Sequence, residues 1–110
     1  MDKKTNLDSR ALGLIKNYAN ILKKNKISFK RLILFGSYAK GKIHRWSDID
    51  VCLTFNKVSD AKRKDVGFFN FLASRIDSRL EIIPMTEESL KNKYDPLASE
   101  IRNYGVEIEF

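Results

Sequence analysis

Cysteine, histidine and proline are scarce in this chain of 110 residues, which contains one Cys, one His and two Pro. A single cysteine excludes a disulfide within the chain, and with one histidine it cannot supply the ligands of a typical structural zinc site. Two prolines, no low-complexity segment and a hydrophobic content of 43% indicate a folded core rather than disorder. We therefore expect one domain over residues 1–110.

Long hydrophobic runs are also missing. No apolar run approaches the length that a membrane-spanning helix needs, and no apolar signal-peptide core follows the polar residues 1–6. A single thiol is typical of a reducing compartment. These features predict a cytoplasmic protein without a membrane partner.

Basic residues outnumber acidic ones, 21 to 14, and the formal net charge is +7. A basic balance favours anionic partners such as nucleotides, nucleic acids or an acidic protein surface. A solvated, lysine-rich surface accounts for the same charge, and no aromatic RNA-binding motif accompanies it. Nucleic-acid binding is therefore left open, but it is not the interpretation that we favour.

The most informative stretch begins with the apolar run Leu32–Phe35, which Gly36 and Ser37 stop abruptly. A short apolar run ended by glycine predicts a buried strand and a tight turn. A second apolar run contains Asp48 and Asp50, with aliphatic residues at the positions between and after them. Side chains of a strand alternate between its two faces. The pattern therefore places the two aspartates on one face.

Two adjacent carboxylates repel one another, and burying them without a partner is costly. A divalent cation removes that cost, and Mg²⁺ is typically bound by one or two carboxylates together with substrate phosphates. Gly36 permits the close approach of a ligand. The Ser37 hydroxyl and the N–H groups of a short helix over 37–40, ended by Gly41, could receive phosphate oxygens.

This combination of Gly-Ser, a short spacer and Asp-x-Asp resembles the nucleotidyltransferase fold of the DNA polymerase beta-like superfamily. The small size resembles its minimal nucleotidyltransferases. The matching residues are Gly36, Ser37, Ser47, Asp48 and Asp50. The resemblance implies an α/β fold with a small mixed sheet flanked by helices. It also implies Mg²⁺-dependent transfer of a nucleoside monophosphate from a triphosphate, with ATP expected, to an acceptor hydroxyl; the aspartates would bind metal, and the glycine and serines would bind the nucleotide.

The resembled family often has a third carboxylate on the next strand, usually an Asp. Glu81, in a predicted strand over 79–84 that Pro84 closes, matches that position by order but departs in residue type. Because Glu is one methylene longer, Glu81 could still complete the metal site and deprotonate the acceptor. The alternatives are a structural Glu81 paired with Arg79, and Asp77 as the third acid.

The spacer contains three cations, Lys40, Lys42 and Arg45. They could contact triphosphate oxygens, which is the role predicted for Lys40, or they could be ordinary loop charges. The resembled family often has an Arg where Tyr38 or Lys40 stands, so this sequence departs from the family pattern here. Trp46 could stack on a base, although packing against the sheet is the favoured interpretation. His44 is expected to be an exposed loop residue.

Helical spacing and capping residues predict the remaining elements. They are helices over 8–24 and 59–77, a short helix after Thr86, a helix from Pro96 to Tyr104 and an edge strand over 106–110. The expected caps are Asp8 or Ser9, Thr86 and Asp95, and the expected apolar side of the helix that begins at Pro96 consists of Leu97, Ile101 and Tyr104. In the second helix, Val66, Phe69, Leu72 and Ile76 form one stripe, and further phenylalanines flank it. That is more aromatic surface than one stripe needs. We favour a thick core, with a protein-docking surface as the alternative.

The predicted elements leave no separate domain to enclose a small acceptor, so the acceptor is expected on another macromolecule. Minimal nucleotidyltransferases are often paired with a helical HEPN protein. The resemblance therefore implies an antitoxin that modifies a Tyr hydroxyl of a HEPN toxin with AMP. A catalytically inactive nucleotide-binding regulator and a basic nucleic-acid-binding module are the alternatives, and a homo-oligomer is left open.

Overall fold

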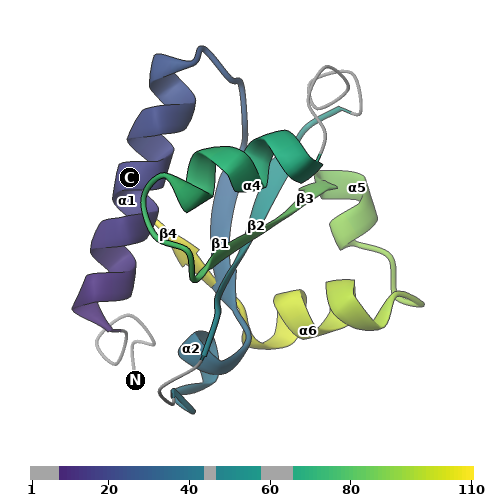
Figure 1. Cartoon of the computed structure of the whole chain (residues 1–110). Helices are drawn as coiled ribbons and strands as arrows, with labels where there is room; N and C mark the ends of the chain where they lie inside the picture. The colour runs from purple at the N-terminus through teal and green to yellow at the C-terminus, as the bar shows by residue number, and fades with distance from the viewer. Residues whose placement is uncertain (1–7, 44–46, 58–65) are drawn as a thin grey trace.

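The computed structural model describes residues 8–43, 47–57 and 66–110. Within them, a four-stranded sheet in the order β3-β2-β1-β4 carries helices on both faces (Figure 1). The elements in chain order are α1 (Ser9–Lys24), β1 (Arg31–Phe35), α2 (Ser37–Lys40), β2 (Ile49–Phe55), α4 (Val66–Ser74), β3 (Leu80–Thr86), α5 (Glu87–Leu90), α6 (Pro96–Tyr104) and β4 (Val106–Ile108). No helix in the described ranges is both long enough and apolar enough to cross a membrane.

The sheet is mixed, as the sequence predicted. β1 pairs antiparallel with both β2 and β4, whereas β2 and β3 are parallel. A parallel pair needs a crossover connection, and α4 belongs to the one that joins β2 to β3. This pairing sets Asp50 between Phe35 of β1 and Glu81 of β3.

Alternation along the strands divides the core between the two faces of the sheet. Leu32 and Leu34 of β1 pack with α1 and α4 in the larger cluster, while Ile33 and Phe35 pack with α5 and α6 in the smaller one. The same alternation sends Ile49 toward the α1/α4 face. Asp50 therefore points to the α5/α6 face.

The predicted helix caps are confirmed. The Asp8 carboxylate accepts a hydrogen bond from the Ala11 N–H at 3.0 Å at the start of α1. Thr86 and Asp95 cap α5 and α6 in the same way, and Pro96 is the first residue of α6. These side chains satisfy N–H groups that the first helical turn leaves without a partner.

Three predicted boundaries are wrong. β4 ends at Ile108, two residues before the predicted end of the edge strand. The second helix ends at Ser74 rather than Asp77, because the chain tightens into turns in which the Asp77 carboxylate accepts from the Arg79 N–H at 2.8 Å. β3 continues through Pro84 to Thr86, because it is an edge strand and a proline there removes no required ladder hydrogen bond. The predicted start of the second helix lies outside the described residues.

Three residues predicted to be buried are exposed instead. Val66 does not join the core stripe of α4, and Leu97 and Tyr104 lie on the outer side of α6. Ala98 and Ile101 form the buried side of α6. Because α6 lies against a small cluster, only a narrow stripe of it is covered.

Asn70 of α4 protects the outer edge of β3. Its amide group donates to the Ile82 carbonyl at 2.9 Å and accepts from the Ile82 N–H at 2.8 Å. Asn70→Ala should therefore lower the free energy of unfolding by about 1–3 kcal/mol, since it leaves both backbone groups without this partner. Chemical denaturation would measure the loss. Asn103→Ala, at an exposed site, is the control; equal stabilities for the two variants would contradict the prediction.

Candidate metal and nucleotide site

Three carboxylates meet at one end of β2 and β3. Asp48 immediately precedes β2, Asp50 is its second residue, and Glu81 pairs with Asp50 in the parallel register. One carboxylate oxygen from each residue lies within 4.8 Å of the others. Asp48 and Glu81 are exposed, and Asp50 is half-buried. The structure thus brings together the three acids that the sequence singled out, and oxygen donors of this kind suit a divalent cation.

The arrangement of the three carboxylates disfavours the charged form of Asp50. Burial, followed by the negative charges of Glu81 and Asp48, raises the pKa of Asp50 from 3.8 to about 6. A hydrogen bond with Glu81 and the charge of Glu100 on α6 act in the same direction. Each of these influences disfavours the charged form of Asp50. A bound cation would offset them.

Gly36 is required at its position for two separate reasons. Its backbone has φ of 74° and ψ of −153°, a region that is essentially restricted to glycine. A Cβ atom built on Gly36 would also collide with the Asp50 carboxylate. The turn between β1 and α2 can therefore lie against Asp50 only because it begins with glycine.

The remaining predicted nucleotide-binding residues lie at the two ends of α2 and shortly before β2. Ser37 is the first residue of α2 and is half-buried, and Ser47 is buried, directly before Asp48. Lys40, in contrast, forms an ion pair with Glu100 at 3.2 Å and lies over the Tyr104 ring. Lys40 would have to leave Glu100 to contact a phosphate.

The spacer is only partly described. Lys42 is exposed, whereas the expectations for His44, Arg45 and Trp46 fall outside the described residues. Sequence reasoning did not identify Glu100 as an acid that influences Asp50, because no local pattern reveals which part of α6 faces the carboxylates.

Arg79 forms its ion pair with Asp77 rather than with Glu81. The guanidinium donates to both carboxylate oxygens of Asp77 at 3.2 Å. Hydrogen bonds from the Arg79 side chain and backbone lower the pKa of Asp77. Glu81 therefore does not form the alternative ion pair with Arg79. Asp77, the other candidate for the third acid, pairs with Arg79 and does not join the three carboxylates.

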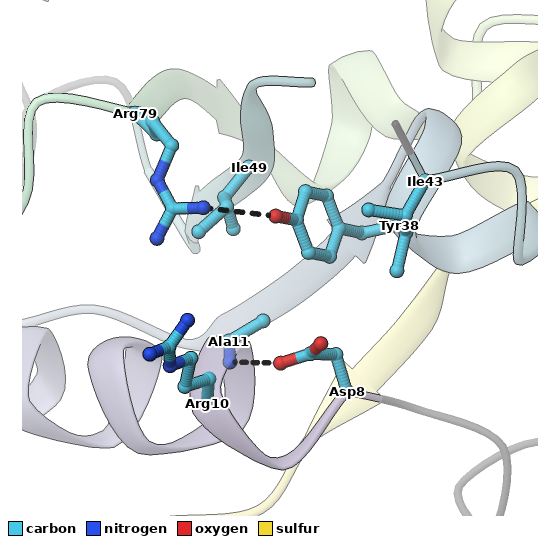
Figure 2. A pocket seen from close by; sticks show the side chains of 7 residues that line it. All are labelled: Asp8, Arg10, Ala11, Tyr38, Ile43, Ile49 and Arg79. Carbon is cyan, nitrogen blue, oxygen red and sulfur yellow. Dashed lines mark hydrogen bonds between the residues drawn. The ribbon is translucent and has the colours of Figure 1, made fainter. Parts of the chain in front are cut away.

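A cavity of about 360 Å³ lies on the α1/α4 face of β2, opposite to the face to which Asp50 points. Sequence reasoning did not anticipate it. Figure 2 shows its lining residues, Asp8, Arg10, Ala11, Tyr38, Ile43, Ile49 and Arg79. Arg79 donates a hydrogen bond to the Tyr38 hydroxyl at 3.2 Å, shown as a dashed line (Figure 2). Since Tyr38 is buried in α2, this contact ties the Gly-Ser turn to the start of β3.

Residues 15–107 match the family described as Nucleotidyltransferase domain, and the chain belongs to that family. It is therefore a nucleotidyltransferase, which confirms the family and enzyme class predicted from Gly36, Ser37, Asp48 and Asp50. Enzymes of this family typically use a divalent metal, and the three carboxylates could hold one.

Similar proteins agree with this assignment. A Methanocaldococcus jannaschii protein named "putative protein adenylyltransferase" is 32% identical over 83 residues, covering 76% of this chain and 82% of that protein. A crystal structure of a "putative nucleotidyltransferase" from Sulfolobus solfataricus has a TM-score of 0.58 at 23% identity, covering 89% of this chain and 78% of the other. A toxin-antitoxin crystal structure with AMP-PNP has a TM-score of 0.56 at 23% identity, covering 89% and 72%. At these identities the two structures show the shared fold.

Proposed function

We propose that this chain is a cytoplasmic enzyme that transfers AMP from ATP to a hydroxyl group on a partner protein, with Mg²⁺ as cofactor. The proposed partner is a helical HEPN toxin. The observation that carries the proposal is the convergence of Asp48, Asp50 and Glu81 beside Gly36. The name of the archaeal relative supports a protein acceptor. The toxin-antitoxin structure with AMP-PNP supports an adenine nucleotide and a toxin partner.

The proposed reaction forms a bond between the acceptor oxygen and the α-phosphorus of ATP and breaks the bond from that phosphorus to the leaving pyrophosphate. Mg²⁺, when bound, supplies charge neutralisation and activates the acceptor hydroxyl. Asp48 and Asp50 hold the cation, and Gly36 and Ser37 receive the triphosphate, with Ser47 assisting. Glu81 completes the metal site and takes the proton of the acceptor hydroxyl.

Co-expression with the protein encoded by the neighbouring gene, followed by intact-mass measurement, tests the proposal. We expect the partner to gain the mass of one or more AMP groups, and to gain none when Asp48 and Asp50 are both replaced by Asn. A stable complex without a mass change would instead favour an inactive regulator. Transfer to a free small molecule without any complex would overturn the protein acceptor.

Glu81→Gln should lower turnover by about 10²-fold if Glu81 accepts the proton of the acceptor hydroxyl. The glutamine side chain has nearly the same size as glutamate, but its amide cannot act as the base. Initial rates at saturating ATP and Mg²⁺ would measure the loss, and Glu88→Gln on the exposed side of α5 is the matched control. An unchanged rate would return Glu81 to a structural role and leave the site with two acids.

A further inference from the structure

Within the described residues, α1 and α4 on one face of the sheet contain positively charged side chains and no negatively charged ones. α1 contains Arg10, Lys16, Lys23 and Lys24 and no acidic residue, and the described α4 contains no charged residue. The helices on the opposite face, α5 and α6, contain three glutamates and one arginine. The net positive charge of the chain is therefore concentrated, in part, on the α1/α4 side.

A groove lies on this basic side, where α1 passes the turn that follows α4 (Figure 1). Its volume is about 470 Å³. Half-buried Leu14, Ile21 and Ile76 provide its apolar surface, and exposed Lys24 and Arg75 provide its cations. From Leu14 to Lys24 the groove follows α1 for about 15 Å, nearly three helical turns.

Phe71 extends the apolar surface next to the groove. Its side chain is 56% exposed, and the Arg75 guanidinium lies 5.9 Å from the centre of its ring. A large aromatic side chain beside a half-apolar groove is more typical of a protein-binding surface than of a solvated helix. In α4, Phe69 is fully buried in the core, whereas Phe71 is exposed to solvent.

We propose that this α1/α4 groove docks an amphipathic helix of a partner protein, whose apolar stripe is flanked by Asp and Glu. An amphipathic helix in an apolar groove is a recurrent recognition mode, and acidic flanking residues would complement Lys24 and Arg75. A second copy of this chain fits less well, because two copies of the same basic face would repel each other. Docking here leaves the three carboxylates accessible, since they lie on the other face of the sheet.

Two synthetic helical peptides with the same apolar stripe, one flanked by Glu and the other by Lys, provide the probes. We expect the acidic peptide to bind at least about tenfold more tightly in fluorescence anisotropy, as charge complementarity requires. Amide chemical-shift changes should map to α1 and to residues 71–76. Equal affinities, or shift changes confined to α5 and α6, would overturn the proposal.

Charge and ring variants make the test specific to the groove. Lys24→Glu together with Arg75→Glu should weaken binding of the acidic peptide at least about tenfold, and Phe71→Ala should weaken it several-fold. Lys91→Glu and Tyr94→Ala, at exposed sites before α6, are the matched controls and should not change the affinity. Phe71→Ala and the single Lys24→Glu keep the test decisive if the double charge reversal does not fold.

Other occupants of the groove give distinct results. Displacement of the acidic peptide by a short single-stranded RNA, with an affinity that falls steeply with salt, would overturn the proposal in favour of nucleic-acid binding. A wild-type dimer that Phe71→Ala converts to a monomer would overturn it in favour of a contact between two copies. None of these readouts depends on nucleotide transfer, so failure here is distinguishable from failure of the proposed reaction.

Discussion

Asp50→Asn is expected to lower nucleotide transfer by about 10³-fold or more while leaving the metal-free protein at least as stable as the wild type. The loss follows from removing a carboxylate that binds the cation, whose charge stabilisation contributes several kcal/mol. The stability follows from removing a half-buried charge that Glu81 and Asp48 repel. Asp48→Asn should reduce transfer similarly. If both variants transferred nucleotide at the wild-type rate, the metal-site assignment would be wrong.

The stability of Asp50→Asn relative to the wild type should depend on pH. Asp50 has a pKa of about 6 in the folded protein and an ordinary value of 3.8, so between these values the folded state binds more protons than the unfolded state. The Asp50 contribution therefore destabilises the metal-free wild type progressively as pH rises from about 4 to 6. The Asn variant lacks this contribution. Its stability advantage should grow across that window and stay constant above it.

Thermal unfolding at several pH values, with and without Mg²⁺, measures both effects. A cation that binds only the folded state should stabilise the wild type, because binding shifts the folding equilibrium. It should stabilise Asp50→Asn much less. Glu88→Gln removes one acid without touching the site and is a suitable control. Cys52→Ser would be a poor control, because Cys52 is buried in the same strand as Asp50.

The position of the site could be predicted largely from residues close together in the chain. The period of two in β2 places Asp48 and Asp50 on one face, and the glycine after β1 marks the turn beside them. The adjacency of Glu81 depends on the register between β2 and β3, which pairs it with Asp50. Chain order made that pairing a reasonable expectation, but only the folded sheet fixes it.

Features set by packing between distant elements could not be predicted in this way. The pairing of Lys40 with Glu100 depends on how α6 lies against α2, which no local pattern records. Pro84 suggested a strand end because proline lacks an N–H, yet an edge strand tolerates it. Helical periodicity located the apolar stripe of α4, but the width of the covered stripe depends on the neighbouring elements, which leave Val66 exposed.

Gly36→Ala is the substitution expected to damage both fold and site. The new Cβ would collide with the Asp50 carboxylate in a backbone conformation of φ 74° and ψ −153°. We expect a loss of about 1–3 kcal/mol in the free energy of unfolding from the backbone alone, and more from the collision. Transfer should fall by about 10²-fold, since a small displacement of a reacting geometry has effects of this size.

Two other glycines separate the causes. Gly41 has a φ of 72° with open space around its Cβ position, and Gly13 lies in α1 with nothing within 4 Å. Gly41→Ala should therefore show backbone strain without the collision, whereas Gly13→Ala should stabilise α1 by about 0.5–1 kcal/mol. Denaturation curves and transfer rates for the three variants would rank the contributions.

The collision itself can be isolated by combining Gly36→Ala with Asp50→Ala, which removes the carboxylate that the new methyl group meets. In a double-mutant cycle, the stability cost of Gly36→Ala should be smaller in the Asp50→Ala background than in the wild type. The remaining cost should be that of the backbone conformation. If the two substitutions were additive, and Gly36→Ala behaved like Gly41→Ala in transfer, then Gly36 would serve only the turn and its close approach to Asp50 would have no part in the site.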